Sequence, residues 1–311
     1  MSAVTAWPAL VLAAGFGTRL GALGRLRAKA ALPVAGRPMI VRILERLADA
    51  GVTRVVINLH HRAESVCGVV GDGSRWGLHV RYSWEPLVLG SAGGPARAVP
   101  LLAADRFLIV NGDTLADIDL DELARTHVAS GALSTLAVAP ADLSRYNALL
   151  ADEGGRLLGS VTRGTPAAAL SDGARPWHFV GVQAVDARAF AGLDGTRPVD
   201  IIREHYPARI AAQPGAVRVW PVSGAFVDIG TPAEYLATAR HFATVERTSL
   251  DRGADVRIEP TADVASSLLW DRVRVGAGAV LSECIVADDV TIPAGVRYHR
   301  QVITRDGVAA L

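Results

Sequence analysis

The chain has 311 residues, half of them hydrophobic, and a formal net charge of +1 at pH 7, which suits one large domain plus a smaller module. The near-neutral charge gives no electrostatic case for nucleic acid or an anionic membrane as a partner. Its two cysteines, Cys67 and Cys284, lie far apart without a CxxC motif, which argues against a disulfide scaffold or a thiolate metal site.

The first predicted strand, Ala9–Ala13, follows an N-terminal segment that lacks the basic start of a secretory signal. The apolar stretch there is too short to span a bilayer and is interrupted by glycines, so we expect a cytoplasmic protein with no membrane partner. Short apolar runs predict six further strands. These are Arg54–Leu59, His79–Tyr82, Arg106–Val110, Ser134–Ala139, Trp177–Val185 and Val217–Val222.

Helical patterns alternate with these strands. Apolar residues at helical spacing predict a helix over Met39–Ala50, which Gly51 would end. Two more helices are predicted over Asp119–Ser130 and Pro232–Val245, the latter with Thr231 as its N-cap. The alternation predicts an α/β fold, with a Rossmann-like, mostly parallel sheet flanked by helices.

Ligands of open α/β sheets bind beyond the carboxyl ends of the strands. Three segments of this chain fall at such strand ends: the loop that starts at Ala13, the run Asn111-Gly112-Asp113, and the segment around Asp228. The sequence therefore predicts that these three segments form the functional site.

From about residue 250 the helical spacing stops, and small residues alternate with Val and Ile in steps of about six, as in 275–280 and 290–296. Such hexapeptide repeats are typical of a left-handed parallel β-helix, here a stub of two or three coils. An ordinary small β-hairpin cap is the alternative. We expect a catalytic domain over 1–248 and a short β-helical tail over 249–311. The tail is a possible surface for homo-oligomer formation.

A glycine-rich loop, Ala13-Ala14-Gly15-Phe16-Gly17-Thr18-Arg19-Leu20, follows the first strand. It lacks the third glycine of a dinucleotide motif and the Gly-Lys-Ser/Thr ending of a P-loop. Ten residues after Arg19 comes Lys29, the single lysine among thirty-one arginines. An ammonium is a compact point charge that fits between crowded phosphate oxygens, whereas a guanidinium is a wide planar fork. Together these residues predict a phosphate site.

This opening resembles that of sugar-1-phosphate nucleotidyltransferases, the NDP-sugar pyrophosphorylases. The order of further motifs is similar: Glu85–Gly94 resembles the base-recognition loop of the family, and Val110–Asp113 and Phe226–Pro232 resemble the segments that present its two metal carboxylates. His178–Val182 resembles the glycine-containing strand beside the sugar. The resemblance covers essentially the whole chain and is closest to bacterial mannose-1-phosphate guanylyltransferase-like proteins.

The resemblance implies a role for each matching residue. Arg19 and Lys29 would be catalytic, and Asp113 and Asp228 would hold Mg²⁺, a hard cation that prefers carboxylate oxygens. The sugar would meet Asn147, Gly181 and Arg163. The nucleotide would bind to residues of the loop, the base-recognition segment and one strand end. These are Leu12, Ala13, Ala14, Gly15, Gly17, Thr18, Glu85, Gly90, Ser91, Ala92 and Asn111.

Two segments depart from the family pattern. The proline that usually precedes the loop lysine is replaced by Ala28, which predicts a less rigid loop. A central Glu-Lys-Pro of many members is replaced by Thr162–Pro166, so either Arg163 substitutes for that lysine or the contact is absent.

We expect transfer of a nucleoside monophosphate from an NTP to a sugar-1-phosphate, with GDP-mannose as the first product to test. UTP- or dTTP-dependent transfer to another hexose or amino-sugar phosphate is the alternative within this chemistry. A catalytically silent homologue that binds NDP-sugar is the alternative outside it. An acyltransferase built on the repeats is disfavoured, because His299 is the only histidine in the tail.

Overall fold

The computed structural model describes residues 7–248, 250 and 253–311. Residue 249, where the β-helical tail was expected to begin, lies outside the described residues, and that domain boundary stays a prediction. By their internal packing, the described residues form two compact units. The first contains 7–15, 43–63 and 70–226, and the second contains 16–42, 64–69 and 227–311.

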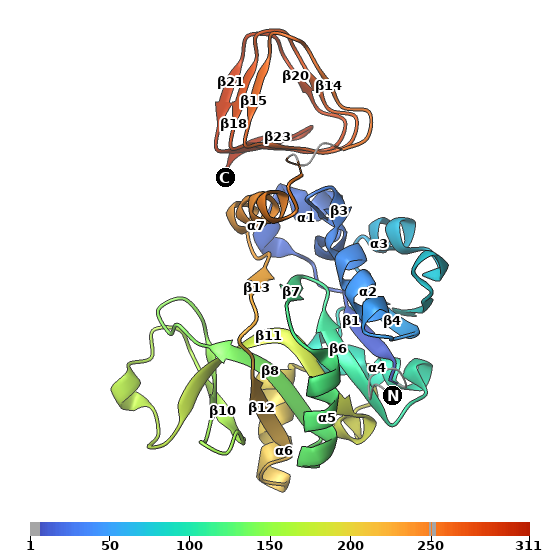
Figure 1. Ribbon diagram of the computed structural model, residues 1–311, viewed down its shortest axis with the longest axis vertical. Coiled ribbons are helices and arrows are strands. Elements are labelled where there is room, and N and C mark those ends of the chain that lie inside the picture. Colours follow the sequence, from blue (N-terminus) through green and yellow to red (C-terminus); the bar gives the residue numbers. More distant parts are fainter. Residues whose placement is uncertain (1–6, 249, 251–252) are drawn as a thin grey trace. The chain divides into compact units, whose positions relative to one another are not determined.

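The first unit is built on a nine-stranded mixed sheet (Figure 1). Its parallel half places β1 (Ala9–Leu12) between β4 (Arg54–Leu59) and β6 (Arg106–Asn111), with β5 (His79–Trp84) outside β4. β1, β4 and β6 are nearly continuous apolar runs, as expected for strands covered on both faces, whereas exposed and buried residues are mixed in the outer strand β5. The prediction of a Rossmann-like sheet flanked by helices is confirmed.

The other half of the sheet is largely antiparallel. The long strand β11 (Arg175–Asp186) pairs with β6, β8 (Ser134–Pro140) and β9 (Ala148–Ala151), and each of these pairings is antiparallel. The strands β9 and β10 (Leu157–Val161) were not expected from the sequence. The remaining strand, β12 (Val217–Pro221), runs parallel to β8.

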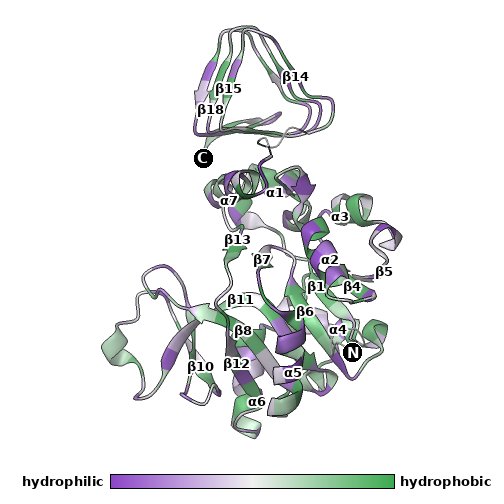
Figure 2. Ribbon diagram, in the orientation of Figure 1, coloured by the Kyte–Doolittle hydropathy of each residue, from purple (hydrophilic) through white to green (hydrophobic). Residues whose placement is uncertain are grey.

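Helices and turns complete this unit, and central strands such as β6 and β8 are mostly hydrophobic (Figure 2). Phe107, Ile109 and Tyr206 lie at the centre of its core. The helix α5 begins after Asp119, whose carboxylate accepts from the N–H groups of Asp121 and Glu122. The elements are α2 (Met39–Asp49), α3 (Ala63–Val70), α4 (Gly90–Leu102), β7 (Thr114–Ala116), α5 (Leu120–Ser130), a π-helical turn (Ile201–His205) and α6 (Tyr206–Ala212), with 3₁₀ turns at Ser74–Trp76, Ala167–Ala169 and Ala187–Phe190. The first residues of α2 and most of α3 belong to the second unit.

The second unit combines short elements from the start of the chain with the helix α7 (Pro232–Val245) and the tail. The predicted cap is confirmed, because Thr231 Oγ1 accepts from the N–H of Glu234. The short elements are the 3₁₀ turn Thr18–Leu20, α1 (Ala22–Leu26), the 3₁₀ turn Lys29–Ala31, β2 (Pro33–Val34), β3 (Arg37–Pro38) and β13 (Phe226–Asp228).

The tail is a triangular coil of parallel strands (Figure 1), which confirms the hexapeptide prediction. Equivalent residues of successive coils are 17 apart, as in Arg257, Arg274 and Thr291, so three coils stack. Val275, Leu281 and Ile292 fill the interior. The strands are β14 (Arg257–Ile258), β15 (Asp263–Ala265), β16 (Leu268–Leu269), β17 (Arg274–Val275), β18 (Val280–Ser282), β19 (Ile285–Val286), β20 (Thr291–Ile292), β21 (Arg297–His299), β22 (Gln301–Thr304) and β23 (Gly307–Ala310). The last strand pairs antiparallel with β22 and covers its edge.

Candidate functional site

The sheet of the first unit has a switch point at β1. From β1 the chain proceeds to β4 on one side and later returns to β6 on the other. The carboxyl ends of β1 and β6 are joined by a hydrogen bond of 2.8 Å from the N–H of Gly112 to the carbonyl of Leu12. Ligands of open α/β sheets bind in the crevice at such a point. The structure has hollows there, and Leu12 and Asn111 line both of them.

The smaller hollow, of about 260 Å³, gathers most of the residues assigned to the nucleotide from sequence. Asn58 and Val88 also line it and were not identified from the sequence, although Asn58 is the last residue but one of a predicted strand. Of the other predicted nucleotide residues in this unit, Ala13 and Ala92 are buried. The predicted residues in the lining are Leu12, Ala14, Gly15, Glu85, Gly90, Ser91, Asn111 and Asp113.

Glu85 ties two loops of this hollow together. Its carboxylate accepts from Asn58 Nδ2 at 2.7 Å and from the N–H of Leu89 at 2.8 Å, and Asn58 Oδ1 accepts from the N–H of Ala13 at 2.7 Å. Glu85 is fully buried, and burial raises the pKa of its carboxyl despite these hydrogen bonds. Glu85 therefore fixes the segment predicted to recognise the base against the loop after β1.

The structure explains the presence of glycine differently at two positions of the predicted nucleotide segments. A side chain at Gly90 would lie 2.7 Å from the carbonyl of Val199, so glycine is required there for close packing at the start of α4. The sequence had suggested a loop for this segment. A side chain at Gly15 would meet no protein atom within 4 Å, and its φ is not positive. The protein's own packing therefore does not require a glycine at 15, and the open space beside it leaves this backbone accessible.

The larger hollow, of about 510 Å³, lies beside β9, β10 and β11 and has the size of a small-molecule site. Asn147 lines it, and Asn147 Oδ1 accepts from the backbone N–H of Arg163 at 2.8 Å. The sequence had linked both residues to the sugar. Ser91, predicted for the nucleotide, also lines it, as do Thr162 and His178 from segments that the sequence had compared with the family. Four further polar lining residues were missed because no local motif marks them. These are Ser160, Gln183, Asp200 and Arg203.

Two of these missed residues differ in what they can offer a ligand. The carboxylate of Asp200 is already used as a helix cap, since it accepts from the N–H groups of Ile202 and Arg203. The guanidinium of Arg203 is exposed and, among the described residues, has no hydrogen-bond or ion-pair partner. Arg203 is therefore the cation that this hollow can offer to an anionic ligand.

Gly181, predicted beside the sugar, has a packing role in the structure. It lies on β11 where the pairing with β8 changes register between Phe179 and Gln183, and its φ is +79°. A Cβ there would lie 2.9 Å from Thr114 Oγ1. Only glycine combines this left-handed backbone with such a close approach.

The second unit holds the predicted cationic residues. Lys29 Nζ lies 3.4 Å from Asp228 Oδ1, and the two side chains are 14% and 44% exposed. The guanidinium of Arg19 packs on Gly230, because a Cβ at 230 would lie 2.8 Å from Arg19 Nη1. Arg19 is exposed and has no hydrogen-bond or ion-pair partner within the described part of the chain. The unit thus brings Arg19, Lys29 and Asp228 together, at the C-terminal end of β13.

The loop before Lys29 is firmly held, contrary to the expectation from Ala28. Ala28 is buried and has φ −57° and ψ 143°, close to the backbone that a proline would impose. Its N–H, which a proline would lack, donates to Ser65 Oγ at 3.0 Å. A hydrogen bond therefore replaces the ring as the source of rigidity. Gly17 and Thr18, also predicted for the nucleotide, form the turn just upstream, and Gly17 has φ +62°.

The carboxylates predicted to hold the metal belong to different units, Asp113 to the first and Asp228 to the second. Among the residues that the structure describes, no three His, Cys, Asp or Glu side chains form a metal-binding group. Proteins bind Mg²⁺ through one or two carboxylates while substrate phosphates and water complete the shell, and the metal role of each carboxylate stays a prediction. This donor set does not suit an all-protein metal cage.

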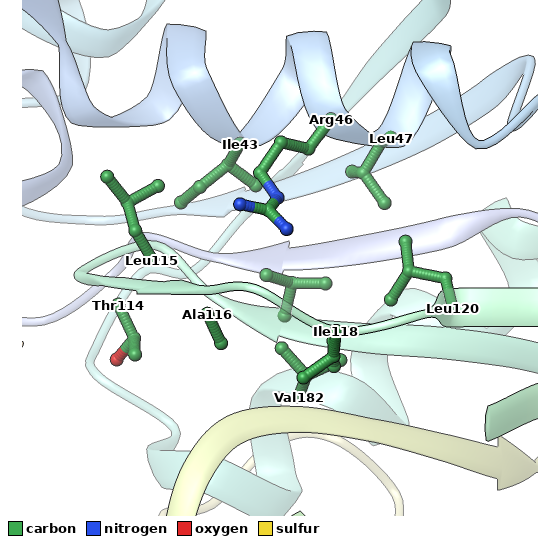
Figure 3. Close-up of a pocket in the computed structure, with 10 residues that line it drawn as sticks. Ile43, Arg46, Leu47, Thr114, Leu115, Ala116, Ile118, Leu120 and Val182 are labelled. Carbon is green, nitrogen blue, oxygen red and sulfur yellow. The ribbon is translucent and has the colours of Figure 1, made fainter. Parts of the chain in front are cut away.

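A third hollow of the first unit lies between α2 and the segment that follows β6 (Figure 3). The side chain of Arg46 points into it between Ile43 and Leu47, and its guanidinium donates to Asp117 at 2.9 Å. Its volume of about 30 Å³ has room for only roughly two water molecules. No nucleotide fits there.

No helix of the described chain is long and apolar enough to cross a membrane.

Comparison with curated proteins gives both uridylyltransferases and guanylyltransferases as relatives. The chain is 46% identical over 112 residues to an N-acetylmuramate alpha-1-phosphate uridylyltransferase of Neisseria meningitidis. The matched region makes up 36% of this chain and about half (48%) of that relative. It is 27% identical over 296 residues to a mannose-1-phosphate guanylyltransferase of Mycobacterium tuberculosis, which covers 94% of this chain and 81% of the relative. A probable mannose-1-phosphate guanylyltransferase of rice is 29% identical over 96% of the chain and 81% of its own length.

Solved structures and family models agree with this fold. HddC from Yersinia pseudotuberculosis superposes with a TM-score of 0.64 at 21% identity, over 76% of this chain and 99% of that one, and a second structure of it is a complex with GMP-PN. Residues 8–158 match the family model described as nucleotidyl transferase, and residues 241–300 match the model described as GlmU-like, C-terminal hexapeptide. The N-terminal part of the chain is thus similar to nucleotidyl transferases, and its C-terminal part is similar to a GlmU-like hexapeptide domain.

Proposed function

We propose that this chain is a Mg²⁺-dependent sugar-1-phosphate nucleotidyltransferase that makes an NDP-sugar and pyrophosphate. The observation that supports this most is the grouping of Arg19, Lys29 and Asp228 beside the turn of the glycine-rich loop. A loop that exposes backbone next to two cations suits the polyphosphate of an NTP. The matched nucleotidyl transferase model over residues 8–158 agrees with this class of reaction.

In the proposed reaction, a phosphate oxygen of the sugar-1-phosphate attacks the α-phosphorus of the NTP. The bond from the α-phosphorus to the bridging oxygen of the β-phosphate breaks, and pyrophosphate leaves. Two anions must meet, so positioning and charge neutralisation dominate the barrier. Lys29 would neutralise the reacting phosphates as a point charge, and Arg19 would pair with the leaving pyrophosphate. The sugar phosphate is ionised near neutral pH, so no general base is needed.

We assign Asp113 and Asp228 to the metal. When bound, Mg²⁺ would supply charge neutralisation at the α-phosphate. The protein's own part is to keep these carboxylates accessible. Asp228 is 44% exposed, and Thr114 Oγ1 donates to Asp113 Oδ1 at 3.3 Å.

GTP and mannose-1-phosphate are the substrates we propose first. The relatives that span most of this chain, its hexapeptide tail included, are named mannose-1-phosphate guanylyltransferases in Mycobacterium tuberculosis and rice. The hollow of about 510 Å³ is large enough for a hexose phosphate. Asn147 and Ser160 could donate to or accept from sugar hydroxyls there.

A second candidate is uridylyl transfer to an amino-sugar 1-phosphate that carries a carboxylate. It is favoured by the 46% identity over 112 residues to the Neisseria uridylyltransferase, whose named substrate is N-acetylmuramate alpha-1-phosphate. That sugar bears a lactyl carboxylate, and Arg203 presents a guanidinium to the larger hollow. An Arg–carboxylate pair is a strong and directional contact.

The test is pyrophosphate release with Mg²⁺ over a grid of GTP, UTP, ATP, CTP and dTTP against the 1-phosphates of mannose, glucose, N-acetylglucosamine and N-acetylmuramate. Release confined to GTP and mannose-1-phosphate would support the first candidate. Release confined to UTP and N-acetylmuramate-1-phosphate would support the second, and Arg203→Gln should then raise KM for that sugar at least tenfold. EDTA should abolish both, and Asp228→Asn should weaken the dependence on Mg²⁺.

Silence across the whole grid would contradict the proposal. If NDP-sugar binding were still detected by calorimetry, the chain would be a silent homologue that binds NDP-sugar. A normal metal titration of Asp228→Asn would remove that carboxylate from the metal site without affecting the rest of the proposal.

A further inference from the structure

The hexapeptide tail holds the segment that carries Lys29. Arg27, two residues before Lys29, donates from Nη2 to Asp271 Oδ2 and to Asp288 Oδ1, both at 2.6 Å, and from Nε to Asp288 Oδ2 at 3.0 Å. Its guanidinium also lies 4.9 Å from the ring centroid of Trp270. Both aspartates and the tryptophan belong to the tail, so a single side chain near the glycine-rich loop makes four contacts with it.

The two aspartates are arranged by the repeat itself. They are 17 residues apart, which is the spacing of equivalent positions in successive coils. They are also joined to each other, since Asp288 Oδ1 accepts from the N–H of Asp271 at 2.9 Å. Stacked coils therefore place two carboxylates at one corner, and the fork of Arg27 reaches both.

The contact is partly protected from water. The side chains of Arg27, Asp271 and Asp288 are 19%, 31% and 21% exposed. Burial by itself would lower the pKa of Arg27, but its hydrogen bonds to Asp288 and Asp271 raise that pKa overall. A partly buried charge pair is screened less by solvent than a surface ion pair. The planar guanidinium also holds its carboxylate partners in a defined geometry.

A second link holds the other end of the same segment. Trp270 is fully buried and donates from Nε1 to Tyr235 Oη at 3.2 Å, and Tyr235 donates its hydroxyl to the carbonyl of Pro33 at 2.7 Å. Between the two links, Lys29 begins a short 3₁₀ turn. The N–H of Leu32 donates to the carbonyl of Lys29 and closes this turn. The tail thus contacts the chain directly on one side of Lys29 and through Tyr235 on the other.

We propose that the tail is an intramolecular brace for Lys29 and that Arg27 is the positioning residue through which it acts. This inference rests on the proposed function for its effect on turnover, because Lys29 is the group that would meet the phosphates. The tail acts on the chemistry from within the same chain, and this role needs no second copy of the protein.

The kinetic test compares matched ion pairs in the full-length protein. Arg27→Gln and Asp288→Asn break the brace, whereas Arg272→Gln breaks a comparable pair inside the tail, where Arg272 Nε donates to Asp289 Oδ1 at 2.6 Å. We expect Arg27→Gln to lower kcat about tenfold with less than about a twofold change in KM for the NTP. Arg272→Gln should leave both within about twofold, and Arg27→Lys should recover part of the loss.

Coupling to Lys29 separates positioning from general damage. If Arg27 acts through Lys29, then Arg27→Gln added to Lys29→Arg should cost less than about a further twofold in kcat. Losses that multiply in the double variant would overturn the proposal. So would an Arg27→Gln variant with the kinetics of Arg272→Gln.

A second readout does not depend on the reaction. We expect amide hydrogen exchange of residues 29–32 to become about tenfold faster in Arg27→Gln and to stay unchanged in Arg272→Gln. If the wild-type protein were silent with every substrate pair, the proposed function would fail, yet this exchange would still report on the brace. Unchanged exchange in Arg27→Gln would refute the brace on its own.

Discussion

At the scale of single residues, the position of the one lysine is the sharpest feature of the chain. Lys29 is 14% exposed and lies 3.4 Å from Asp228, so a larger head group has little space. We predict that Lys29→Arg lowers turnover about tenfold or more, because a planar fork cannot replace a point charge between phosphates. Steady-state pyrophosphate release measures this, and unchanged kinetics would remove Lys29 from the reaction.

The buried Glu85 allows a prediction about pH. Asn58→Asp would place a second carboxylate 2.7 Å from Glu85, whose pKa burial already raises. Two carboxylates that close share a proton, so the pKa of the pair in the folded state lies above its unfolded value. The folded state then binds protons more tightly, and stability present at low pH is lost as pH rises through the folded pKa.

Urea unfolding at pH 5 and pH 8 tests this. Relative to wild type, Asn58→Asp should cost about 3 kcal/mol or more at pH 8 and clearly less at pH 5. Asn58→Ala, which removes the hydrogen bonds without adding charge, is the control. Losing the Asn58 donor also raises the pKa of Glu85, so its cost should rise from pH 5 to pH 8 in the same direction but by less than that of Asn58→Asp. A cost for Asn58→Asp that grew toward pH 5 would contradict the argument.

At the scale of elements, the sequence predicted those with a regular pattern and missed those made by packing. The helix Pro232–Val245 was predicted exactly, because a cap, a proline and apolar spacing agree. The helix α4 was missed, since its Gly90-Ser-Ala-Gly-Gly-Pro start has low helix propensity. Its glycines are required by neighbours, because a Cβ at Gly94 would lie 2.6 Å from Glu85 Oε1. Tertiary packing overrides propensity there.

The site divides in the same way. Motif residues such as Asn111 and Glu85 could be placed at a hollow because they follow strands directly. Asp200 and Arg203 carry no local motif and reach the larger hollow only through the fold. The contact of Arg27 with Asp288 joins residues 261 apart, which no local pattern encodes.

The attachment of α5 to the sheet gives a second prediction about pH. His127 is buried on α5 and pairs through Nδ1 with Thr135 Oγ1 of β8 at 2.9 Å, and burial lowers its pKa to about 4. Because the folded pKa lies below the unfolded 6.5, its stabilisation is complete above pH 6.5 and is lost as pH falls toward 4. His127 should therefore account for about 2–3 kcal/mol of lost stability between pH 7.5 and 4.5.

The measurement is the difference between wild type and His127→Gln in urea unfolding at both pH values. Gln can keep the hydrogen bond to Thr135 but does not titrate. We expect the variant to lose less stability than wild type on acidification. Equal losses of stability in the two proteins would show that protonation of His127 does not cause the loss on acidification.

The rigidity of the segment before Lys29 can be tested by replacing the hydrogen bond of the Ala28 N–H with the ring of a proline. Ala28 already has a proline-like backbone, and Arg27 before it is extended, as proline requires. We predict that Ser65→Ala, which removes the acceptor of the Ala28 N–H, costs about 1 kcal/mol. Adding Ala28→Pro should recover about 0.4–1 kcal/mol by restricting the unfolded chain. Thermal unfolding measures both, and further loss in the double variant would show that the pocket around Ala28 cannot accept the ring.

At the scale of the whole molecule, the tail can serve as a brace, as an assembly surface, or as both. Removing residues 253–311 deletes Asp271, Asp288 and Trp270, so Arg27 would lose its carboxylates and Tyr235 its indole donor. We predict a lower unfolding temperature and a kcat reduced at least as much as by Arg27→Gln. Sedimentation of the full and shortened proteins separates the two roles. If the tail is only a brace, its removal leaves the number of subunits unchanged. If the tail is an assembly surface, its removal lowers that number. Unchanged stability and turnover in the shortened protein would exclude the brace.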